Sequence, residues 1–175
     1  MTKPSLSLCF LPLAAMAQQA PAPVAPVAPV AEPRMFISAT QIAERIAKAD
    51  AATKAGTPYE GVPMLLQGAF KANMEYHVGA SPMFNVHEND AELFVVIDGA
   101  GTLTLGGTLI NPTRKGTNLQ ATAAEGGAPY KLVKGDMVLI PENMVHSVTQ
   151  TDGKLVMLSM HLPHPAPVPV APPAP

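Results

Sequence analysis

The stretch GASPMFNVHENDAELFVVIDG, residues 79–99, decides the fold of this chain. It begins and ends on a glycine and carries Asn85, His87 and Glu92 between them. Residues two apart in a strand face the same side, so Asn85 and His87 are expected to point together into a barrel. Glu92 follows a short polar turn and is expected to face the same interior from the next strand.

A second stretch, GDMVLIPENMVHSVTQ at residues 135–150, supplies His146 just after a turn. A carboxylate buried among apolar side chains is costly unless it is paired or bound to a metal. His87, Glu92 and His146 would together form a 2-His-1-carboxylate face for a divalent metal ion. Such a face leaves coordination positions open for water, O₂ or a bidentate substrate.

The chain from residue 64 onward has the pattern of an all-β domain. Short apolar or alternating runs are separated by Gly, Pro, Asn or Asp, which favours a sandwich or closed barrel. The expected strands are residues 64–70, 72–78, 92–97, 102–105, 130–133, 137–140, 146–149 and 155–162. The polar segment 111–129 is expected to be a surface loop or a lid.

One helix is expected, over residues 38–54, ahead of the strands. Ser38 and Gln41 have the spacing of a capping box, in which each side chain bonds the other residue's backbone N–H. Ile42, Ile46 and Ala49 fall on one face of this helix. An amphipathic helix beside an all-β domain is expected to pack on the outside of the sheet.

Both ends of the chain differ in composition from its middle. Residues 1–17 have the pattern of a signal peptide, which predicts a periplasmic or secreted protein. A cytoplasmic product is the alternative if translation starts at Met35. The Pro/Ala-rich residues 18–34 predict a stiff linker, and residues 163–175 predict a disordered tail. The folded domain is therefore expected over residues 35–162.

Composition excludes several classes of function. The 175 residues carry a formal net charge of −2, which gives no electrostatic attraction for nucleic acid. Tryptophan is absent and aromatic residues make up 5% of the chain, which argues against a base-stacking surface. The apolar run near the N-terminus is too short to span a bilayer.

The first stretch resembles the first motif of the cupin superfamily. That motif has a glycine, a His-x-His pair, a glutamate and a second glycine at set spacings, and Gly79, His87, Glu92 and Gly99 fit them. One residue departs from the motif, because Asn85 stands where the family has its first histidine ligand.

The second stretch is similar to the second cupin motif. Gly135, Pro141 and His146 fit its spacing, with Asn143 in place of a glycine and Gln150 in place of an asparagine. The resemblance implies a double-stranded β-helix, or jelly-roll barrel, and a homodimer is compatible with it. It also implies a divalent metal ion, with Fe, Mn, Zn, Ni and Cu not distinguished, and dioxygenase, isomerase or lyase chemistry.

Asn85 leaves the function open. Its amide oxygen could be a weak fourth ligand, it could hydrogen-bond a bound water or substrate, or it could mark the loss of metal binding. The leading hypothesis is a metal-dependent enzyme that acts on a small organic molecule. The alternatives are a non-catalytic module that binds or senses a small ligand, and a β-domain tethered to a partner through its Pro-rich segments.

Two further histidines, His77 and His161, each have a functional and a simpler structural interpretation. His77 could approach the site from a neighbouring strand, although a strand-edge position is the favoured expectation. His161 alternates with three apolar residues, Leu158, Met160 and Leu162. That alternation favours a strand whose apolar side faces the core and whose His161 faces water, with an inward acid–base role as the alternative.

Overall fold

The computed structural model describes residues 34–54, 56 and 58–164. The expected signal peptide, nearly all of the linker and most of the tail lie outside the described residues, so export stays a prediction. Within the described part of the chain, no helix has the length and apolar character needed to cross a membrane.

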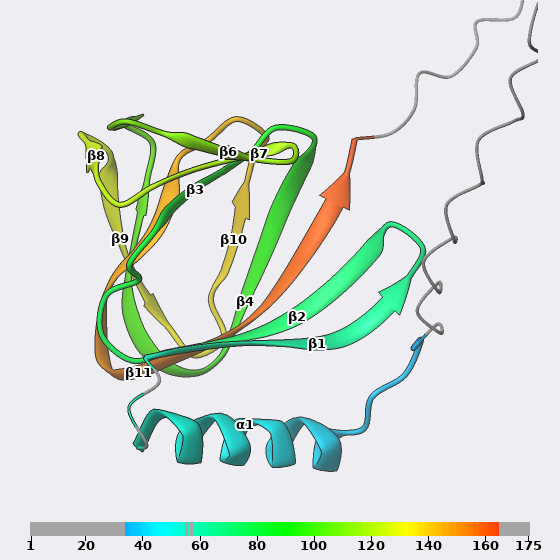
Figure 1. The fold of residues 1–175 in the computed structure, drawn as a ribbon. Coiled ribbons are helices and arrows are strands. Elements are labelled where there is room, and N and C mark those ends of the chain that lie inside the picture. Colours follow the sequence, from blue (N-terminus) through cyan, green and yellow to red (C-terminus); the bar gives the residue numbers. More distant parts are fainter. Residues whose placement is uncertain (1–33, 55, 57, 165–175) are drawn as a thin grey trace, which may run out of the picture. The chain divides into compact units, whose positions relative to one another are not determined.

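The expected helix is present as α1 (Ala39–Lys54). Its capping box is formed: Ser38 N donates to Gln41 Oε1 at 2.9 Å, and Gln41 N donates to Ser38 Oγ at 3.2 Å. Ile42, Ile46 and the buried Ala49 turn toward the strands. The helix therefore packs outside the sheet, as predicted (Figure 1).

The strands form a curled antiparallel sheet, the jelly-roll barrel (Figure 1). Hydrogen-bonded neighbours run in the order β1-β2-β11-β3-β7-β6, and β4 also pairs with β9, β10 and β11. The strands are β1 (Tyr59–Gln67), β2 (Phe70–His77), β3 (Phe84–His87), β4 (Asp90–Leu105), β5 (Thr108–Leu109), β6 (Thr113–Lys115), β7 (Asn118–Ala121), β8 (Ala124–Glu125), β9 (Ala128–Val133), β10 (Met137–Ile140) and β11 (His146–Pro163). A separate small ribbon pairs β5 with β8.

Two pairs of expected strands are single long strands. Residues 92–97 and 102–105 both belong to β4, and residues 146–149 and 155–162 both belong to β11. Gly99 has a φ of 75°, and a Cβ built there would lie 2.0 Å from the Lys154 carbonyl oxygen. Glycine thus marks a close approach of β4 to β11 here, and the ladder continues on both sides of it.

The expectation of a loop or lid at residues 111–129 is wrong. The segment holds β6, β7 and β8 and the start of β9, and β7 pairs with β3 over four residues, from Phe84↔Ala121 to His87↔Asn118. Its polar side chains hid the strands because β6 and much of this hairpin stay exposed, so alternation with buried residues is weak.

The sheet has two hydrophobic cores, one on each face. Inside the barrel lie Phe94, Val96, Leu103, Leu132, Ile140, Val148, Leu155 and Met157. Beneath α1 lie Met64, Met74, Tyr76 and Val156 together with Ala49. On β2, Met74 and Tyr76 face the helix, so the intervening Asn73, Glu75 and His77 face the barrel cavity. The helix layer therefore takes up apolar faces and leaves polar faces toward the cavity.

Candidate metal centre

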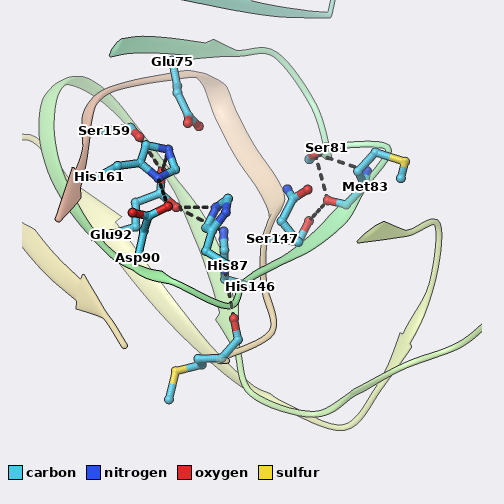
Figure 2. A network of polar contacts seen from close by, with 12 residues as sticks. Glu75, Ser81, Met83, His87, Asp90, Glu92, His146, Ser147, Ser159 and His161 are labelled. Carbon is cyan, nitrogen blue, oxygen red and sulfur yellow. Dashed lines mark hydrogen bonds and ion pairs between the residues drawn. The ribbon is translucent and has the colours of Figure 1, made fainter. Parts of the chain in front are cut away.

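Glu92 is the centre of the candidate site. It lies on β4 between β10 and β11, opposite Ile140 and His161, and is only 2% exposed. His87 from β3 and His146 from the start of β11 each bring Nε2 to 3.2 Å from Glu92 Oε2 (Figure 2). The structure thus brings together the three residues expected to form the 2-His-1-carboxylate face.

The charges in this cluster support an ionised carboxylate. Burial alone would raise the pKa of Glu92, but the adjacent imidazoles of His146 and His87 outweigh it and hold that pKa below its usual range. Burial alone would lower the pKa of His87, but the adjacent Glu92 carboxylate outweighs it and raises that pKa. Each group thus stabilises the charge of the other in a water-poor pocket.

Asn85 occupies the same cavity but is engaged elsewhere. Its Oδ1 accepts a hydrogen bond of 2.8 Å from Gln120 Nε2 on β7, and its backbone lies opposite His146. The Gln120 partner was not identified from the sequence, because it lies in the segment expected to be a loop.

His161 does not face water as expected. Its Nε2 lies 3.6 Å from Glu92 Oε1, and its side chain is 21% exposed. Ser159, two residues earlier on β11, is fully buried and donates from Oγ to the same Oε1 atom. The apolar residues that were expected to mark the core side, such as Leu158, instead pack in the layer under α1. The inward position of His161 could have been predicted from its alternation with Ser159, because both are polar residues on an otherwise apolar part of the strand.

The residues present fit a divalent metal ion. Glu92 Oε2 lies near two imidazole nitrogens yet has no hydrogen-bond partner of good geometry among the described residues. Two donor atoms that each lie about 2.1 Å from one ion are separated by about 3.0–3.4 Å at tetrahedral or octahedral angles. The 3.2 Å separations are of that size. His146 Nδ1 lies 3.1 Å from the Met144 carbonyl oxygen, which leaves Nε2 free for a metal.

The site opens onto a cavity of about 310 Å³. Beside the cluster, Phe94, Leu103 and Met83 form an apolar part of its wall, and β2 contributes a polar part. On that polar part, His77 Nε2 lies 3.0 Å from Glu75 Oε2. His77 is buried, contacts the Tyr59 ring and lines the cavity, so it is neither at a strand edge nor in the Glu92 cluster.

Comparison with known proteins gives likeness in structure only. No family model matches the chain, and no curated protein matches it. Hydroquinone 1,2-dioxygenase PnpCD, solved with Cd²⁺ and 4-hydroxybenzonitrile, is 20% identical at a TM-score of 0.48, over 66% of this chain and 71% of that one. BH2720 from Bacillus halodurans is 14% identical at a TM-score of 0.49, over 78% of this chain and 87% of that one.

The Cnp3 cupin domain of Schizosaccharomyces pombe is 8% identical at a TM-score of 0.43, over 62% of this chain and 63% of that one. Identities of this size say nothing about shared substrates. The likeness to cupins therefore stays with the chain itself: its two spaced motifs resemble those of the cupin superfamily, and the jelly-roll barrel brings their histidines and glutamate together.

Proposed function

We propose that this protein is a metal-dependent cupin that acts on a small polar organic molecule. The observation that carries the proposal is the pair of imidazole nitrogens from His87 and His146, each 3.2 Å from one oxygen of a buried carboxylate. An ionised carboxylate is retained in a barrel interior when cations or hydrogen bonds compensate its burial. Glu92 would hold the ion by Oε2, and the two histidines by Nε2.

The ion, when bound, supplies Lewis acidity toward an oxygen atom of the substrate, or redox chemistry if it is iron. The protein supplies position and shielding. Phe94 packs edge-on against His146, with ring centroids 6.3 Å apart, and keeps the ring in place. Ser159 fixes the carboxylate through Oε1, which leaves Oε2 directed at the histidines.

The cavity favours a small ligand with hydrogen-bonding groups at two ends. The metal cluster lies on one part of its wall, and Asn73, Glu75 and His77 lie on the strand β2. A volume of about 310 Å³ lies at the lower end of the range for small-molecule sites, roughly 300–1,000 Å³. Glu75 and His77 are thus placed to orient a hydroxyl, amine or carboxyl group of the substrate.

Metal analysis of the purified full-length protein tests this proposal. Wild type is expected to retain close to one divalent ion per chain after dialysis. His87→Ala and His146→Ala are each expected to lose it, because two donors remain of the three-residue face. His164→Ala is the matched control, since His164 is exposed and pairs with Glu142 away from the site. Unchanged metal content in both site variants would refute the ligand assignment.

A second candidate function is a cupin that binds or senses a small ligand without turnover. The observation in its favour is Asn85, which stands at a ligand position of the family motif and is hydrogen-bonded to Gln120. A thermal-shift screen separates the two functions, because a ligand that binds the folded state raises the melting temperature. Stabilisation by metabolites and none by Fe, Mn, Zn, Ni or Cu salts would favour the binding module.

A further inference from the structure

We propose that His161 supplies the imidazole that Asn85 lacks, so that the metal centre has three histidines and one glutamate. This inference rests on the metal site proposed above and deepens it. The cupin motif takes its first histidine ligand from the strand that here is β3. In this chain that position is asparagine, and the third imidazole comes from the far end of β11.

The backbone places His161 at the site. Its Cα lies opposite that of Glu92 in the ladder between β11 and β4. His161 lies 15 positions after His146, and an odd offset in a regular strand puts two residues on opposite faces. The ladder of β11 with β4 shifts register at three places between the two histidines. These irregularities restore a common face, and both rings line the one cavity.

The side chain of His161 comes within reach of the other donors. Nε2 lies 3.6 Å from Glu92 Oε1, and the ring stands edge-on to His87 with centroids 4.8 Å apart (Figure 2). One donor atom from each of His87, Glu92 and His161 lies within 4.8 Å of the other two. Donors on one ion with bonds of about 2.1 Å lie about 3.0–3.4 Å apart, so the three side chains would share an ion after closing by about 1 Å or a little more.

The other ring nitrogen of His161 is also suitably placed. Nδ1 faces Asp90 Oδ2 at 3.9 Å, which is too long for a hydrogen bond, while Nε2 is the nitrogen that faces Glu92. Histidines that bind metals commonly direct their second nitrogen at a carboxylate or carbonyl oxygen. Here Nδ1 is directed at Asp90 and Nε2 at the other donors, which is the orientation that a ligand through Nε2 needs.

Asn85 cannot take this role without losing a partner. Its Oδ1 already accepts from Gln120 Nε2 at 2.8 Å, and an amide oxygen is a weaker ligand than an imidazole for Fe, Ni, Cu or Zn. The asparagine therefore stands beside a metal centre that is complete without it. On this assignment the altered motif marks a relocated ligand, and four protein donors leave the remaining coordination positions for substrate.

The experiment measures zinc affinity of the full-length protein by competition with a chromophoric chelator. The variants are His161→Ala, His161→Gln, Asn85→Ala and the control His164→Ala, with apo-protein folding checked by circular dichroism. Loss of an imidazole is expected to weaken zinc binding at least about tenfold in both His161 variants, as losses of orienting partners alone reach about 10–100-fold. Asn85→Ala and His164→Ala are expected to stay close to wild type. Wild-type affinity in the folded His161 variants would overturn the assignment.

Two further measurements separate a ligand from a packing residue. Electron paramagnetic resonance of the copper(II)-loaded protein is expected to show three coordinated nitrogens in wild type and two in His161→Gln. Weaker binding with an unchanged nitrogen count would overturn the proposal. The double variant Asn85→His/His161→Ala is expected to regain affinity, and a double variant no better than His161→Ala would refute the equivalence of the two positions. If wild type itself binds no metal, the proposed function fails first.

Discussion

The two oxygens of Glu92 have separate partners. Oε2 faces His87 and His146, and Oε1 accepts from Ser159 and lies near His161. A carboxylate held at one oxygen keeps the other in a fixed direction. Ser159 is therefore a positioning residue for the proposed metal site, although it would not contact the ion itself.

Ser159→Ala is predicted to weaken metal binding without unfolding the barrel. The expected loss is about 10–100-fold in affinity, because the variant frees a carboxylate that a buried hydroxyl now orients. Zinc competition titration measures it. Ser147→Ala is the matched control, since Ser147 is buried in the same cavity wall but donates to the Met83 carbonyl oxygen at 2.8 Å. Equal losses in the two variants would assign the effect to general packing.

The sequence alone predicted part of this site, and the reason is local spacing. His87 and Glu92 are five residues apart across a short turn, and His146 lies just after a turn, so simple strand geometry brings them inward. The inward position of His161 depends on irregularities in the β11–β4 ladder, which no local sequence pattern predicts. Ser159 depends on a helix that covers the opposite face of its strand. Both need the tertiary arrangement.

Helix α1 is capped at its start and joined to the sheet near its end. The capping box of Ser38 and Gln41 satisfies backbone N–H groups at the first turn. Toward the other end, the Tyr76 hydroxyl on β2 donates to Asp50 Oδ1. The capping box stabilises the helix itself, while the Tyr76–Asp50 hydrogen bond and the apolar layer under α1 hold the helix against the sheet.

Ser38→Ala is predicted to lower the free energy of unfolding by about 1 kcal/mol, the usual cost of losing an N-cap side chain. Chemical denaturation measures the change. Thr40→Ala is a suitable control, because Thr40 is exposed on the first turn of the helix. An effect of Ser38→Ala no larger than that of Thr40→Ala would show that the capping box contributes nothing to stability.

The Tyr76–Asp50 hydrogen bond gives a pH-dependent contribution to stability. This bond, more than any other contact, lowers the pKa of Asp50, while burial first and Asp50 second raise the pKa of Tyr76 to about 12. A carboxyl whose pKa is lower in the folded than in the unfolded state stabilises the fold above its usual pKa. That stability is lost as the pH falls through the lowered value.

Tyr76→Phe is therefore predicted to be less stable than wild type at neutral pH and to approach wild type in acid. Thermal melts at a series of pH values from neutral to strongly acidic measure the difference. A constant difference between the two proteins across that series would show that the loss comes from packing of the ring and not from the carboxylate.

The helices and strands differ in how well they can be predicted from their sequence. Helix α1 was predictable within one residue at its start because its cap and its apolar face are both local. The continuity of β4 and of β11 was not predictable from the sequence. A glycine in a sequence usually indicates a turn, but the glycines of β4 allow two strands to approach closely. The exposed strands around β7 lack the burial pattern that identifies a strand.

For the whole domain, a metal at Glu92 would join β3, β4 and both ends of β11. These strands meet at the site from positions far apart in the sequence. A bound ion therefore stabilises the folded state, because the unfolded chain does not bring these donors together. Zinc at about 100 times its dissociation constant is predicted to stabilise the domain by about 2.7 kcal/mol, and a chelator is predicted to reverse the gain. Calorimetry of wild type and Glu92→Gln tests this, and equal metal responses would contradict it.

The strand β2 presents apolar residues to α1 and polar residues to the cavity. One face of this strand therefore contributes to the stability of the fold, while the other helps to determine what the cavity can bind. Substitutions at Asn73, Glu75 or His77 alter the second face and leave the layer under α1 untouched. In evolutionary terms, such a barrel can acquire a new substrate while its free energy of unfolding stays nearly the same. Libraries of variants confined to those inward positions should therefore retain a high proportion of folded members.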